Sequence, residues 1–144
     1  MKYRETTGYK YILHEDMQRD IQIFEDAEND YISLHLGRLI IKATYAWDGS
    51  SIPLKKYIPF WNFDKYCLIA SLVHDALCQL MREDLLPKSY KPTADLIYGD
   101  MCVGGGMSYR GADRRYKWLR RFGDAGIKKR ENPRGQIKQF PPSK

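Results

Sequence analysis

The residues best suited to chemistry lie in the most apolar segment of the chain, residues 66–81. On a helix, spacings of three, four and seven residues place the polar or reactive side chains of this segment on one stripe. These are Ser71, His74, Asp75 and Cys78. An ionisable pair in a hydrophobic helix is costly unless it is paired or functional. His74 and Asp75 are therefore the starting point for a functional interpretation.

Neighbouring residues on a helix diverge by about 100°, so His74 and Asp75 would address two adjacent sites. His74 could face the next helix, where Asp95 would hold one ring nitrogen and leave the other as a general base. Asp75 could point towards a turn at Asp48, where carboxylates and carbonyls could hold a divalent cation, with calcium as the first choice. The alternative is structural, with the His–Asp pair fixing helix packing and Asp48 capping a turn. Both interpretations stay open. The Ser71 hydroxyl is expected to hydrogen-bond to the backbone of the preceding helical turn.

A β region should come before these residues. Residues 9–13 alternate in polarity, and residues 21–23 form a short extended stretch. Residues 31–36 and 39–45 predict a hairpin joined at Gly37-Arg38. The acidic segment 25–30 predicts a solvated turn, and residues 47–53 break the strand pattern with Asp-Gly and Ile-Pro.

Helices should follow the β region. A central helix is expected from Asp64 to about Arg82, a second one from near Pro92 to the glycines at 104–106, and a third over about 108–122. The pattern predicts a single α+β domain over residues 1–123, with an antiparallel sheet packed on three helices. Residues 124–144 are expected to form a basic, flexible tail.

The charge is unevenly distributed along the chain. Residues 1–109 carry 12 basic and 15 acidic side chains, whereas residues 110–144 carry 12 basic and 3 acidic ones. This asymmetry suggests that the C-terminal part binds an anionic partner, which could be nucleic acid, a membrane surface or an acidic protein. The alternative is a solvated surface with a loose basic tail and no partner. The basic residues at 110–121 are expected on the solvent-facing sides of the third helix. The candidate contacts are Arg110, Arg114, Arg115, Lys117, Arg120, Arg121, Lys128, Lys129 and Arg130.

The three cysteines, Cys67, Cys78 and Cys102, lack Cys-x-x-Cys spacing. Their number and spacing predict buried free thiols in a reducing compartment. No apolar run reaches the length of about 18 residues that a membrane span requires, and the charged N-terminus does not predict a secretory signal.

Four motifs in succession resemble a phage and prophage family catalogued as domain of unknown function 1353. They are WDGSSIP at 47–53, ASLVHDAL at 70–77, Ala94-Asp95, and WLRRFG at 118–123. The resemblance covers residues 38–123, although the family commonly has an aromatic residue in place of Cys78. It implies a bacteriophage protein, located in the host cytoplasm during infection or in the virion.

The arrangement of His74 and Asp75 on one helix and Asp95 on the following helix is also similar to calcium-dependent secreted phospholipases. That resemblance implies that His74 activates water, Asp75 holds calcium and Asp95 orients the histidine. One hypothesis is therefore a metal-assisted hydrolase that cleaves an ester or another cell-envelope bond. The other is a non-enzymatic phage accessory or virion component, whose basic C-terminal third binds other phage proteins or nucleic acid.

Overall fold

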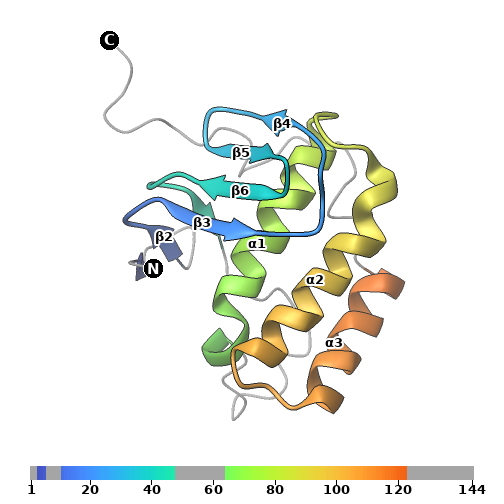
Figure 1. Cartoon of the computed structure of the whole chain (residues 1–144). Helices are drawn as coiled ribbons and strands as arrows, with labels where there is room; N and C mark the ends of the chain where they lie inside the picture. Colours follow the sequence, from blue (N-terminus) through green and yellow to red (C-terminus); the bar gives the residue numbers. More distant parts are fainter. Residues whose placement is uncertain (1–2, 6–10, 48–63, 123–144) are drawn as a thin grey trace.

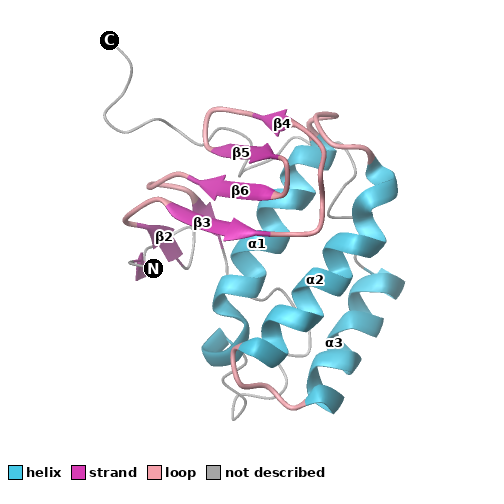
Figure 2. Ribbon diagram, in the orientation of Figure 1, coloured by secondary structure: helices cyan, strands magenta, loops and turns pink. Residues whose placement is uncertain are grey.

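The computed structural model describes residues 3–5, 11–47 and 64–122, which form an α+β fold (Figure 1). Antiparallel strands come first in the chain and three α-helices follow, as Figure 2 shows, so the predicted fold class is confirmed. The turn with Asp48 lies outside the described residues. So does the predicted basic tail with Lys128, Lys129 and Arg130.

The described strands form two antiparallel sheets. The first has the order β1 (Tyr3–Glu5), β2 (Tyr11–Leu13) and β7 (Ala46–Trp47). The second has the order β3 (Met17–Asp20), β6 (Arg38–Ile41), β5 (Ile32–His35) and β4 (Ala27–Glu28). Within β5 and β6, buried and more exposed residues alternate, which gives the second sheet one apolar face.

The predicted hairpin is confirmed, but its turn lies one residue earlier than expected. His35 pairs with Arg38, so the turn residues are Leu36 and Gly37. Both have positive φ, 46° and 82°, as the two-residue turns that match strand twist require. Gly37 is also needed for space, because a Cβ there would lie 2.9 Å from the carbonyl oxygen of Ile21.

Three other predictions for the β region are wrong. Residues 21–23 are not a strand, and Ile21 instead donates a backbone hydrogen bond to Gly37. The acidic segment 25–30 is not wholly a solvated turn, because Ala27 is buried and pairs with Leu34 to make β4. The strand break predicted at 47–53 starts too early, because Trp47 belongs to β7 and is fully buried, whereas residues 48–53 lie outside the described residues.

The helices begin and end close to the predicted residues. They are α1 (Asp64–Arg82), α2 (Lys91–Gly104) and α3 (Tyr109–Phe122), with the short 3-10 helix η2 (Lys88–Tyr90) before α2. In Figure 1, α2 lies between α1 and α3, and the four-stranded sheet lies over α1. No helix among the described residues is long and apolar enough to cross a membrane.

Two apolar clusters hold these elements together. The larger one joins the sheets to α1 and contains fully buried side chains such as Ile41, Trp47 and Leu77. The smaller one lies among the three helices. Its buried members are Cys67, Ala70, Tyr98, Cys102, Met107 and Ala112. The polar stripe of α1 is divided between these surroundings, because Ser71 contacts Trp47 of β7 and His74 contacts Asp95 of α2.

Candidate functional site

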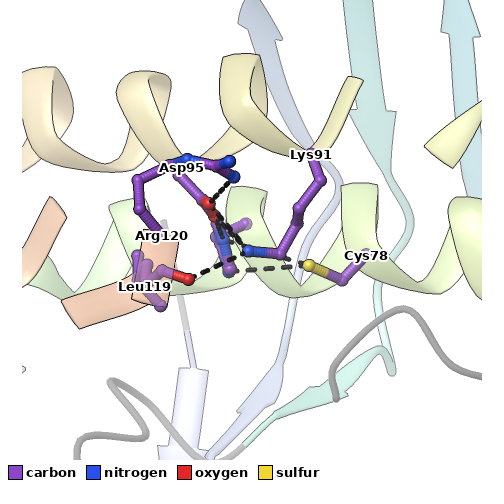
Figure 3. A network of polar contacts seen from close by, with 6 residues as sticks. Cys78, Lys91, Asp95, Leu119 and Arg120 are labelled. Carbon is purple, nitrogen blue, oxygen red and sulfur yellow. Dashed lines mark hydrogen bonds and ion pairs between the residues drawn. The ribbon is translucent and has the colours of Figure 1, made fainter. Parts of the chain in front are cut away.

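A carboxylate with no exposed surface, Asp95 of α2, is the centre of a network of charged groups (Figure 3). Its Oδ1 accepts a hydrogen bond from His74 Nε2 at 2.7 Å. Lys91 Nζ donates to Oδ1 and Oδ2 at 2.6 and 2.7 Å, and Arg120 Nη1 donates to Oδ2 at 3.1 Å. Each carboxylate oxygen thus accepts two hydrogen bonds from cationic or potentially cationic groups, which satisfies the buried charge.

The three helices each supply part of this network. Lys91 and Asp95 are four residues apart on α2, a spacing that places them on one face. Lys91 Nζ also lies 3.4 Å from the carbonyl oxygen of Leu119, near the end of α3. His74 comes from α1 and Arg120 from α3, so the carboxylate ties all three helices together.

The ring of His74 is fixed by this contact. Because Asp95 accepts at Nε2, that nitrogen carries a hydrogen, and Nδ1 points away from the carboxylate. Cys78 Sγ lies 3.7 Å from Nδ1 and 3.9 Å from Nε2. The two nitrogens direct their in-plane bonds apart, so a sulfur almost equidistant from both cannot lie on the bonding axis of Nδ1. Cys78 therefore packs against the ring without occupying the proton-accepting direction of Nδ1.

The network shifts the protonation of both partners. Burial by itself lowers the pKa of His74, but the neighbouring Cys78 sulfur and the Asp95 carboxylate outweigh it, so the pKa lies above its ordinary 6.5. Burial raises the pKa of Asp95, but the hydrogen bonds from His74 and Lys91 outweigh that, so the pKa lies below its ordinary 3.8. Ionised Asp95 beside protonated His74 is the favoured state at neutral pH.

The cysteine prediction is partly wrong. Cys67 of α1 and Cys102 of α2 form a disulfide, whereas Cys78 is a buried free thiol, as expected. Sequence spacing gave no sign of the pairing, because the two cysteines lie 35 residues apart and meet only when α1 and α2 pack. The predicted reducing compartment rested on free thiols and loses that support.

Of the two residues predicted to hold a cation, one lies in the described part of the chain. Asp75 is half-buried on α1, and Asp48 lies outside the described residues. Among residues 3–5, 11–47 and 64–122, no group of three or more His, Cys, Asp or Glu side chains could hold a metal ion. The calcium site therefore stays a prediction.

The basic residues of α3 divide into two groups. Arg115, predicted to face solvent, is 4% exposed and donates to the Tyr98 hydroxyl at 2.7 Å, so that prediction is wrong. Arg120 is half-buried on Asp95 instead of being fully exposed. The exposed members are Arg110, Arg114, Lys117 and Arg121.

Sequence reasoning brought together His74 and Asp95 but missed Lys91 and Arg120. The spacing of Lys91 and Asp95 was a usable signal, because residues four apart on a helix are neighbours. Arg120 had no such signal, since its contact depends on how α3 packs against α2. The expectation for Ser71 is confirmed: its hydroxyl donates to the Leu68 carbonyl at 2.7 Å and accepts from Trp47 Nε1 at 3.1 Å.

Comparison with protein-family models, with curated proteins and with solved structures found no match to this chain.

Proposed function

We propose that this chain is a phage-encoded hydrolase that cleaves an ester or another cell-envelope bond, with His74 as general base and Asp95 as the residue that orients it. The observation that supports the proposal most directly is the 2.7 Å contact between His74 Nε2 and the fully buried Asp95. A histidine held at one nitrogen by a carboxylate is a recurrent arrangement for activating a nucleophile at the other nitrogen.

The chemistry follows from this arrangement. Nδ1 of unprotonated His74 would accept a proton from a water molecule as that water attacks the scissile bond. The imidazolium that forms would be stabilised by the negative charge of Asp95. Lys91 and Arg120 keep the carboxylate ionised and hold it in place, so they act as positioning residues. His74 is 8% exposed, and a substrate would have to approach this small accessible area.

The raised pKa of His74 sets the expected pH profile. A general base works only in its unprotonated form, and at pH 7 that form of His74 is the minority because the pKa is raised from 6.5 to about 10. The value of kcat/KM should therefore rise with pH beyond neutrality, up to the pKa of His74. No catalytic step is assigned to a cation, because Asp75 is the one predicted ligand among the described residues.

The proposal is tested by assaying the full chain on phospholipid, simple ester and peptidoglycan substrates, with calcium, magnesium or zinc added separately. His74→Gln should reduce kcat by about 10²–10⁴-fold, the usual contribution of a positioned general base. His14→Gln changes an exposed histidine and serves as the matched control. Near-ultraviolet circular dichroism of both variants shows whether the fold is retained. Wild type and His74→Gln being equally inert on every substrate would refute the proposal.

A further inference from the structure

One outward face of α3 carries a continuous row of cationic side chains, which we call the basic stripe. Its members are Arg110, Arg114, Lys117 and Arg121. Intervals of four, three and four residues place them within one narrow sector of the helix. All four are exposed, in contrast to Arg115 and Arg120, which turn inward to Tyr98 and Asp95.

Arg115 and Arg120 are held by contacts to α2, whereas the stripe residues lie on the exposed surface of α3. The one acidic side chain of α3 is Asp113, which pairs with Lys117 at 2.9 Å. The stripe together with Asp113 still carries a formal net charge of +3. The whole segment from Arg110 to residue 144, which includes the stripe, carries 12 basic and 3 acidic residues.

We infer that the basic stripe is a docking surface for the phosphate backbone of nucleic acid. A membrane-binding amphipathic helix needs an apolar face that is available for insertion. The apolar face of α3 is already packed against the rest of the protein. Ala112 is 3% exposed, and a Cβ added at Gly99 of α2 would lie 3.5 Å from the Cβ of Tyr116. The stripe residues themselves are all cationic, which suits a polyanion.

The dimensions of the stripe fit a duplex. From Arg110 to Arg121 the helix rises about 17 Å. A duplex segment of that length carries roughly ten phosphates over its two strands, which exceeds the number of cations in the stripe. Tyr109, 80% exposed beside the stripe, could stack on an unpaired base. Contacts to the backbone do not depend on base sequence, so binding should be non-specific.

The test uses the full chain and a mixed-sequence duplex of about 20 base pairs, titrated over a range of salt concentrations. The stripe variant is R110Q/R114Q/K117Q/R121Q. The control variant, R19Q/R38Q/K42Q/K88Q, removes the same charge from exposed residues of β3, β6, the position after β6 and η2. For wild type, log Kd should depend steeply on log salt. The stripe variant should lose roughly 3–4 units of that slope, and the control variant should keep it.

Equal slopes for the stripe and control variants would overturn the inference, since net charge and not the stripe would then govern binding. So would binding to vesicles containing phosphatidylserine without binding to the duplex. Deletion of residues 124–144 gives a third comparison. If this deletion abolished the salt dependence of Kd while the stripe variant kept it, the inference would also be overturned. His74→Gln should bind the duplex as wild type does, so this test is independent of the proposed hydrolysis.

Discussion

The two sides of α1 are held to their neighbours by different physical forces. On the sheet side, apolar burial is accompanied by neutral hydrogen bonds, from Trp47 Nε1 to Ser71 and from the Tyr45 hydroxyl to Gln79, both 3.1 Å long. On the side that faces α2, His74 meets Asp95, which Lys91 and Arg120 also contact. Both sides of α1 thus bury apolar residues, but only the side that faces α2 adds a network of buried charges.

The two sides of α1 should therefore differ in how strongly they respond to pH and to the removal of single charges. Neutral hydrogen bonds and apolar contacts change little between pH 4 and pH 9 because none of their groups titrates there. Burying charges is costly, and the cost is recovered only while every charge keeps its partner. We therefore expect the charged side to respond strongly to pH and to the loss of single charges, and the sheet side to respond to neither.

The largest effect should come from Asp95→Asn. This change leaves the ammonium of Lys91, 2% exposed, without a counter-charge and should lower the free energy of unfolding by about 3–5 kcal/mol. Urea denaturation followed by circular dichroism measures the change. Asp113→Asn is the matched control, because it removes a carboxylate from an exposed pair with Lys117 and should cause no measurable loss.

A second variant sharpens this result. Lys91→Met combined with Asp95→Asn should recover part of the loss, because no lysine charge is then buried without a partner. A double variant as unstable as the sum of both single variants would show that packing, and not charge, dominates this side of α1.

The disulfide should contribute somewhat less. Replacing Cys67 and Cys102 together by alanine opens the link between α1 and α2 and should lower the free energy of unfolding by about 2–4 kcal/mol under non-reducing conditions. Wild type treated with a reductant should approach the stability of that variant, whereas a wild type that is equally stable with and without reductant would contradict this account. Cys78→Ala controls for the loss of a buried thiol.

The smallest effect should come from the sheet side. Tyr45→Phe removes the hydroxyl that donates to Gln79 and should cost about 1 kcal/mol. Because neither group is ionised, the loss should be the same at pH 5 and pH 8, as measured by urea denaturation at both pH values. A strongly pH-dependent loss would break the distinction between the two sides.

The sequence was most informative where a residue's environment depends on local spacing. Asp64 as a helix cap and the long apolar run predicted both ends of α1. The contact of His74 with Asp95, one of two interpretations left open by the sequence, is present in the structure. β3 and β4 were missed because only one residue of each is buried, so neither shows alternation. Arg115 was placed on the solvent side, although its spacing of three from Ala112 and four from Leu119 puts it on the packed face.

Other features required the packed helices. The disulfide between Cys67 and Cys102 and the contact of Arg120 with Asp95 join residues 35 and 25 positions apart in the chain. Periodicity can assign each residue to a face of its own helix, but it cannot say which faces of two helices meet or at what height. The members of the charged network were therefore only partly predictable.

The shifted pKa values also determine how stability depends on pH. His74 has a raised folded pKa, so its contribution is complete below 6.5 and is lost as the pH rises through the folded pKa. Asp95 has a lowered folded pKa, so its contribution is complete above 3.8 and is lost as the pH falls through the folded pKa. The free energy of unfolding of wild type should therefore decline above pH 6.5. The decline should be weaker in His74→Gln.

The most direct measurement is an NMR titration of the His74 ring in the wild-type protein. Ionised Asp95 beside His74 predicts a pKa above the 6.5 of an unperturbed imidazole, with Nε2 protonated throughout the range in which the fold persists. Two results would contradict the claim that the charged network positions His74. One is a ring pKa at or below 6.5, and the other is a neutral ring with its proton on Nδ1.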